Sequence, residues 1–301
     1  QIHEPVRDVR AIPEGHSGFT YWIELDGRRA VLRLPPPNVR IAGPADIPRQ
    51  ARLMAALHAQ GVPVPAILSA SSEPVVAARP FMLMEAVDGK RIEETLAAGI
   101  APIQCVRSAI EVLRRLQAVP IAQTGIGDEA AMPLTGELAR WAWLMERAPE
   151  ELTGRAPRLR ARLAERMPAE QAPVMMHGDY HFGNMLFRDG RVVAVLDWEI
   201  AQIGQPVLDP ACLAVVARAQ GGDDAHPGRV GGWDVLIEDV RDLAGSGDAF
   251  PWALALTYYK YAAIFGYNLM LHRRGKRPDP SYEQRTDTIL RFIDEGIALL
   301  G

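Results

Sequence analysis

The chain has 301 residues, of which 48% are hydrophobic and 23% are charged, and its formal net charge is −4. This is the composition of a globular protein with a sizeable core, and the lack of a basic excess argues against a general nucleic-acid binder. Cys105 and Cys212 are too few for a disulfide framework, and the uncharged halves of the apolar segment 250–272 are too short for a membrane span. We therefore expect a soluble cytoplasmic protein with neither nucleic-acid nor membrane partners.

The first predicted elements are the two strands of a β-hairpin. Residues 18–25 and 28–34 are rich in aromatic and β-branched side chains, and Asp26-Gly27 between them is a typical hairpin turn. Three consecutive prolines, residues 35–37, end the second strand because proline cannot donate to a ladder.

A helix is predicted from Asp46 to Gln60. Asp46 is a suitable N-cap, Pro48 lies in the first turn, and Gly61 is a typical residue for the C-terminal end. Residues 62–71 and 79–87 then predict two more strands.

The rest of the chain is predicted to be mostly helical. Apolar residues recur at helical spacing from Ile103 to Leu113, and residues 136–147 and 251–271 are typical of further helices. Short β-rich runs around residues 174–199 interrupt this region. The order of elements predicts an α+β protein with two lobes: a small antiparallel β lobe with one main helix, residues 1–87, and a larger, mostly helical lobe, residues 88–301.

Polar residues of catalytic type are concentrated in the segment HGDYHFGN and in LDWE, which follows the next apolar run. Asp179 precedes Asn184 by five residues, and Asp197 follows Asn184 by thirteen. Phosphoryl transfer requires such a set: one carboxylate orients the attacking hydroxyl, while an amide oxygen and a second carboxylate hold magnesium. Two strands joined by a turn at residues 188–190 would return Asn184 and Asp197 to the same end of a hairpin.

Two further residues of this segment have more than one interpretation. His177 is expected to brace the loop, and Glu199 either supports the metal from behind its ligands or caps the segment that follows. A hydrolytic metal cluster of His177, Asp179 and His181 is another hypothesis, which we set aside because the remaining histidines lack metal-ligand spacing.

These motifs resemble those of a known family. HGDYHFGN with LDWE is similar to the catalytic and metal-binding loops of the aminoglycoside phosphotransferase and choline kinase superfamily, whose two-lobed fold is protein-kinase-like. Residues 14–36 resemble the phosphate loop and following strand of the branch related to kinase domains fused to acyl-CoA dehydrogenases. FMLMEAVDG resembles the strand and hinge that cradle adenine, and GQPVLDPACLA resembles the segment in which Asp209 would brace the catalytic loop.

The resemblance, which extends over nearly the whole chain, implies a kinase that uses ATP, or alternatively GTP, with Mg²⁺ and phosphorylates a hydroxyl of a small molecule. It implies that Asp179 is the catalytic base and that Asn184 and Asp197 are the metal ligands. Arg33 would pair with the nucleotide phosphates. The residues implied to bind the nucleotide are Ser17, Gly18, Phe19, Arg33, Gln50, Met84, Glu85, Val87 and His181.

One departure from the family pattern motivates an alternative function. Gln50 stands where the helix glutamate would anchor the phosphate-binding basic residue, and the phosphate loop has Ser17-Gly18 where this branch usually has Ser-Asn. We therefore expect Arg33 to be poorly held in the empty site, because a neutral amide replaces the acid. The alternative function is a nucleotide-binding interaction module with weak or no catalytic activity.

The phosphate acceptor stays open between an antibiotic, such as an aminoglycoside or a macrolide, and a metabolite, such as a hydroxyacyl compound. An acidic run within residues 223–248 would suit a polycationic aminoglycoside, whereas the basic run 272–277 would suit the phosphates of coenzyme A. Such runs are more often solvated surface, and these two point in opposite directions. The sequence indicates no oligomeric state.

Overall fold

The structure is a computed structural model that describes residues 5–12, 18–220, 235 and 237–301. Within them the chain divides into two compact units. The first unit comprises residues 1–130 and 174–203, and the second comprises residues 131–173 and 204–301. The lobe boundary predicted after residue 87 stays a prediction.

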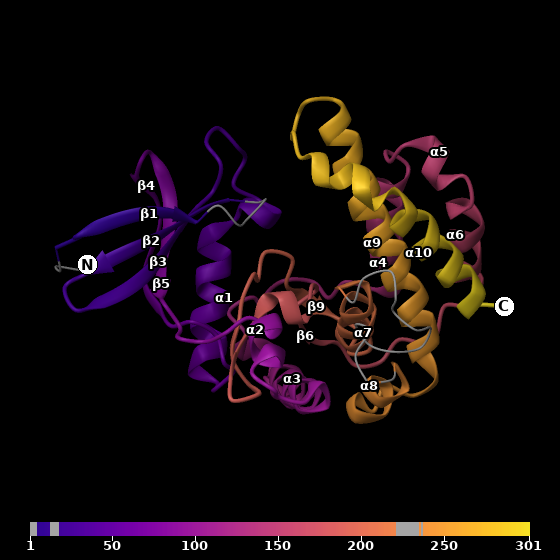
Figure 1. The fold of residues 1–301 in the computed structure, drawn as a ribbon, viewed down its shortest axis with the longest axis horizontal. Coiled ribbons are helices and arrows are strands. Elements are labelled where there is room, and N and C mark those ends of the chain that lie inside the picture. The colour runs from indigo at the N-terminus through magenta and orange to yellow at the C-terminus, as the bar shows by residue number, and fades with distance from the viewer. Residues whose placement is uncertain (1–4, 13–17, 221–234, 236) are drawn as a thin grey trace. The chain divides into compact units, whose positions relative to one another are not determined.

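The first unit contains an antiparallel sheet with the strand order β1-β2-β3-β5-β4 (Figure 1). The predicted hairpin is confirmed, because Leu25 pairs with Arg28 across the Asp26-Gly27 turn. The strands of the sheet are β1 (Asp8–Ile12), β2 (Phe19–Leu25), β3 (Arg28–Leu34), β4 (Ile67–Val76) and β5 (Arg79–Glu85).

The strands of this sheet differ from the prediction in several bounds: β4 ends at Val76 rather than at Ser71, and β5 ends at Glu85 rather than at Val87. β1 was not predicted, and β4 begins at Ile67 rather than at Val62. Pro63 and Pro65 explain the later start of β4, because a proline has no backbone N–H to donate to a neighbouring strand.

The predicted helix is α1 (Ile47–Ala59), which packs on β4 and β5. The Asp46 side chain accepts a hydrogen bond from the Arg49 N–H at 2.9 Å and so caps the helix as predicted. Gly61, just past the end of the helix, has a φ of +75°, a left-handed conformation that favours glycine.

The first unit also contains the segments that carry the predicted site. β7 and β8 form an antiparallel hairpin in which Arg188 pairs with Arg191. Its two turn residues, Asp189 and Gly190, both have positive φ, as a two-residue hairpin turn of this kind requires. The elements are α2 (Ile92–Ala97), α3 (Pro102–Ala118), β6 (Val174–Met176), β7 (Met185–Arg188), β8 (Arg191–Val195) and β9 (Gln202–Gly204), which pairs with β6 at the end of the unit.

The second unit is helical and is built around α9, with α4, α6, α7 and α10 packed on it (Figure 1). Aromatic residues of α9 such as Tyr258 and Tyr259 are buried. Although α9 is the longest of the described helices, neither it nor any other described helix is long and apolar enough to cross a membrane. The helices are α4 (Leu134–Met145), α5 (Glu150–Thr153), α6 (Ala156–Glu165), α7 (Leu208–Gln220), α8 (Ile237–Ala244), α9 (Phe250–Arg273) and α10 (Thr286–Leu299).

The turn between β4 and β5 gives a test of the fold. Val76 pairs with Arg79, and the exposed turn residues Ala77 and Ala78 have φ of 48° and 57°, a conformation that alanine adopts at a cost. Replacing Ala77-Ala78 by Asn-Gly should raise the free energy of unfolding by about 1 kcal/mol, measured by urea denaturation.

The control is Ala97→Gly, which replaces an exposed alanine at the end of a helix, where glycine only adds freedom to the unfolded chain. It should lower the free energy of unfolding by about 0.5 kcal/mol. If the Asn-Gly turn also lowers stability, the left-handed conformation of this turn is wrong.

Candidate active site

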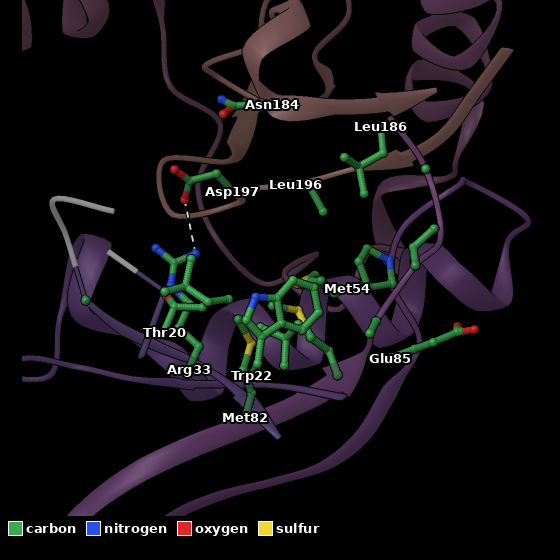
Figure 2. Close-up of a pocket in the computed structure, with 18 of the residues that line it drawn as sticks. Thr20, Trp22, Arg33, Met54, Met82, Glu85, Asn184, Leu186, Leu196 and Asp197 are labelled. Atoms are coloured by element: carbon green, nitrogen blue, oxygen red, sulfur yellow. Dashed lines mark hydrogen bonds and ion pairs between the residues drawn. The ribbon is translucent and has the colours of Figure 1, made fainter. Parts of the chain in front are cut away.

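A cavity of about 620 Å³ lies within the first unit, a volume that suits a small-molecule ligand. One wall comes from the sheet and carries Thr20, Trp22 and Met82, and the other carries Asn184 and Asp197 (Figure 2). Residues of the predicted nucleotide site and of the predicted metal site therefore line a single cavity.

The β7–β8 hairpin explains why residues thirteen positions apart meet. Met185 pairs with Val195, and the Leu196 N–H donates to the Asn184 carbonyl oxygen at 2.8 Å. Asn184 and Asp197 therefore lie at the same end of the hairpin, as predicted from the spacing. Asp197 has a φ of 63°, so the chain turns sharply directly after the strand. This left-handed conformation is tolerated better by aspartate than by most residues.

Arg33 of β3 is held by two carboxylates. Its Nη1 donates to Asp197 Oδ1 at 3.1 Å, drawn as the dashed line in Figure 2, and its Nη2 donates to Glu199 Oε2 at 2.9 Å. The Arg33 side chain is only 11% exposed, so these partners neutralise a charge that is largely removed from water. This corrects the expectation that Arg33 is poorly held: the acid that α1 lacks is supplied from the chain after β8.

Gln50 does not take the predicted place beside Arg33 as a hydrogen-bond partner within the described residues. Its side chain is fully buried, and Nε2 donates to the Pro44 carbonyl oxygen at 2.9 Å. Gln50 Oε1 is buried and accepts no hydrogen bond from the described residues. Gln50 is also not among the residues that line the cavity.

Asp179, His181 and Asn184 form a network at the loop before β7. Asn184 Nδ2 donates to the Asp179 carbonyl oxygen at 3.0 Å and lies 3.3 Å from Asp179 Oδ2. His181 Nδ1 accepts from the Gly183 N–H, and His181 Nε2 lies 3.3 Å from Asp179 Oδ2. Because the Asn184 amide nitrogen faces Asp179, its oxygen is left to bind another partner.

His177 joins the two loops that carry Asp179 and Asp197. Its side chain is fully buried, Nε2 donates to the Leu196 carbonyl oxygen at 2.8 Å, and Nδ1 accepts from the Asp179 N–H at 3.1 Å. Burial lowers the pKa of His177 to about 4, so the ring is neutral near pH 7 and both hydrogen bonds use the same tautomer. The interpretation of His177 as a residue that braces the loop is consistent with these contacts.

Some of the residues predicted to bind the adenine and the phosphates of the nucleotide line the cavity, and others do not. Met84, Glu85 and Val87 line the cavity, whereas the Glu85 carboxylate is exposed and, in Figure 2, lies away from Asp197. Gly18 also lines it, and a Cβ there would lie 2.9 Å from the Leu34 carbonyl oxygen, so the close approach of β3 requires glycine. Phe19 does not line the cavity but lies under the Arg79 guanidinium. Ser17 lies outside the described residues.

Several cavity residues were not singled out from the sequence. Thr20 and Trp22 are two residues apart in β2 and therefore lie on the same face of the strand, so strand periodicity is the signal that could have found them. Leu186 and Leu196 supply apolar surface from the hairpin (Figure 2), and only the paired hairpin shows that they share the cavity.

The chain matches the model of the Phosphotransferase enzyme family over residues 8–243, and it belongs to that family. Acyl-CoA dehydrogenase family member 10 of Mus musculus is 31% identical over 211 residues, which are 66% of this chain and 20% of that protein. The chain thus spans about a fifth of the length of this relative. Both findings confirm the resemblance found in the motifs.

Solved structures confirm the predicted protein-kinase-like α+β fold. A protein of Ralstonia eutropha that is named as a candidate aminoglycoside phosphotransferase has a TM-score of 0.79 at 20% identity, over 99% of this chain and 93% of that one. A thermostable mutant of aminoglycoside phosphotransferase APH(4)-Ia, in a ternary complex with ADP and hygromycin B, has a TM-score of 0.64 at 17% identity, over 95% and 94% of the two chains.

The buried His177 predicts a pH dependence of stability. The pKa of His177 is about 4 in the folded chain and about 6.5 when the ring is exposed. Between these two values the ring is protonated in the unfolded chain but stays neutral in the folded chain. The free energy of unfolding should therefore fall as the pH drops from 6.5 towards 4. Between pH 7.5 and pH 5 we expect a loss of about 2 kcal/mol from this residue.

The measurement is urea denaturation of the wild type and of His177→Gln at both pH values. We expect the variant to be less stable than the wild type at pH 7.5, because the two hydrogen bonds of the His177 ring are replaced. On acidification, however, its free energy of unfolding should fall by about 2 kcal/mol less than that of the wild type. Equal losses in the two proteins would show that His177 titrates normally.

Proposed function

We propose that this chain is a phosphotransferase that uses ATP and Mg²⁺ to phosphorylate a hydroxyl group of a small molecule. The observation that carries the proposal is the convergence of Arg33, Asn184 and Asp197 on one cavity, with Asp179 hydrogen-bonded to Asn184 beside it. Membership of the Phosphotransferase enzyme family supports it. The ADP-bound complex of a protein with this fold supports ATP as the nucleotide, and GTP stays the alternative.

The metal-binding residues fit a magnesium ion. Asn184 has an amide oxygen that its own hydrogen bonds leave available, and the Asp197 carboxylate lines the cavity. Magnesium prefers such hard oxygen ligands and completes its shell with water and phosphate oxygens, so two protein ligands suffice. Bound there, it would neutralise charge on the transferred phosphoryl group.

Asp179 would orient the acceptor hydroxyl and take its proton as the hydroxyl oxygen attacks the γ-phosphorus. The bond from the γ-phosphorus to the β–γ bridging oxygen would break, and ADP would leave. The Asp179 side chain is 27% exposed, so an acceptor can reach it, and His181 and Asn184 limit its rotation. Arg33 would offset the negative charge of the nucleotide phosphates from the sheet side of the cavity.

The alternative of an interaction module with weak or no catalytic activity rests on Gln50 and on the altered phosphate loop at Ser17-Gly18. The first ground is weakened, because Glu199 and Asp197 hold Arg33 without an acid on α1. The second is not tested, because Ser17 lies outside the described residues. Turnover of ATP in the presence of candidate acceptors distinguishes the two functions.

The acceptor class is the open part of the proposal. Within the basic run 272–277, Arg273 is paired with Glu151 and Glu283, which leaves less charge for coenzyme A phosphates. Three of the seven acidic residues within 223–248, Asp223, Asp224 and Asp234, lie outside the described residues. A screen of ATP consumption against aminoglycosides, macrolides, choline-like amines and hydroxyacyl-CoA esters identifies the class.

Asp179→Asn should lower turnover by ~100-fold or more, because a positioned base is lost while the side chain keeps its shape. Nucleotide affinity should stay within a few-fold, since Asn184 also donates to the Asp179 backbone. The two are measured as kcat with the acceptor found in the screen and as the Kd for ATP. Near-wild-type turnover would remove Asp179 from the mechanism.

Asp197→Ala should remove the strengthening of ATP binding by magnesium, because the lost carboxylate is a predicted metal ligand. Trp22, which lines the cavity, offers a fluorescence signal for titrations with and without the metal, and Trp22→Phe assigns that signal. If magnesium strengthens binding to the variant as much as to the wild type, Asp197 is not a ligand.

A further inference from the structure

The two acids that pair with Arg33, Asp197 and Glu199, differ in their position relative to the cavity. Asp197 lines the cavity and is the predicted metal ligand, whereas Glu199 is not among the cavity-lining residues. The Glu199 side chain is 21% exposed, compared with 39% for Asp197. Glu199 is therefore the more enclosed partner of the arginine, and Asp197 is the more accessible to a ligand.

α1 contributes no acid that pairs with Arg33. Gln50, at the position expected to anchor Arg33, donates to the backbone at Pro44 and is neutral. Asp46, at the start of the helix, is engaged as its N-cap. The anchor of Arg33 is thus located two residues after Asp197, in the same segment as the predicted metal ligand.

We propose that Glu199 is a positioning residue that keeps Arg33 directed at the nucleotide phosphates, and that Asp197 exchanges Arg33 for a divalent cation when the substrate complex forms. This proposal rests on the function proposed above. An Asp197 oxygen that ligates a cation is a poorer partner for a guanidinium, because the two positive charges repel each other. Glu199 can keep Nη2 while Nη1, released from Asp197, turns to a phosphate oxygen, since the guanidinium has donors on separate nitrogens.

The exchange would keep charges balanced in both states. In the ligand-free chain Arg33 is neutralised by two carboxylates, so its guanidinium is not an isolated cation. In the substrate complex the phosphates replace Asp197 as the second anionic partner of Arg33. Cation and nucleotide would therefore bind cooperatively, since each favours the same change of partner.

The test is a double-mutant cycle in nucleotide binding. Glu199→Gln removes the charge but keeps the shape, and we expect the affinity for ATP with Mg²⁺ to fall at least about tenfold. In an Arg33→Met background the same change should alter the affinity less than about twofold, because Glu199 acts through Arg33. Binding is measured by calorimetric titration, which does not depend on turnover.

Glu129→Gln is the matched control. Glu129 pairs with Arg49 at 2.6 Å within the same unit and does not line the cavity. This variant should lower the melting temperature but leave the affinity for ATP with Mg²⁺ within about twofold of the wild type, because an ion pair outside the site is lost.

Two outcomes overturn the proposal. An equal loss of affinity in both backgrounds would mean that Glu199 acts on the cation itself, and a gain in affinity on Glu199→Gln would mean that it acts mainly by repelling phosphate. If the wild type binds no nucleotide, the proposed function fails. In that case, and also if Arg33→Met binds ATP too weakly to titrate, thermal denaturation without ligand tests the Glu199–Arg33 pair by itself. Arg33→Met and Glu199→Gln should then lower the melting temperature non-additively, and additive shifts would contradict the pair.

Discussion

The hydrogen bonds of one buried histidine hold the site together. His177 donates to the Leu196 carbonyl oxygen and accepts from the Asp179 N–H, so the segment with the predicted base and the segment with the predicted metal ligand are fixed to one ring. This works only while the ring is neutral, because a protonated ring has no acceptor for the Asp179 N–H. Burial keeps it neutral, and contact with Trp198, with ring centroids 4.6 Å apart, excludes water from one side.

The charged side chains at the cavity neutralise one another. Carboxylates beside buried strands are costly unless something neutralises them, and Arg33 does so for Asp197 and Glu199 from the opposite side of the cavity. The arrangement places Arg33, Asp197 and Asn184 around one space, and Glu199 pairs with the arginine from outside the lining of the cavity. A phosphate with its metal would introduce charges of both signs, which this set can accommodate by changing partners.

Family membership and fold constrain the chemistry more than the substrate. The chain belongs to the Phosphotransferase enzyme family, and one solved structure with this fold is a ternary complex with ADP and hygromycin B. Its curated relative with 31% identity is a much longer acyl-CoA dehydrogenase family protein. Because one fold can act on different substrates, the acceptor of the proposed reaction is not fixed by family membership.

The sequence alone determined the elements whose signals are local. The Asp26-Gly27 hairpin, the capped helix α1 and the spacing that returns Asn184 and Asp197 to one end of a hairpin all follow from turn chemistry, capping and strand pairing over short stretches. Tertiary structure decided what depends on contacts between distant segments. Glu199 meets Arg33 across 166 residues, and Gln50 turns to Pro44 instead. No local pattern specifies such a pair, because it arises only when β3 and the segment after β8 pack around the same cavity.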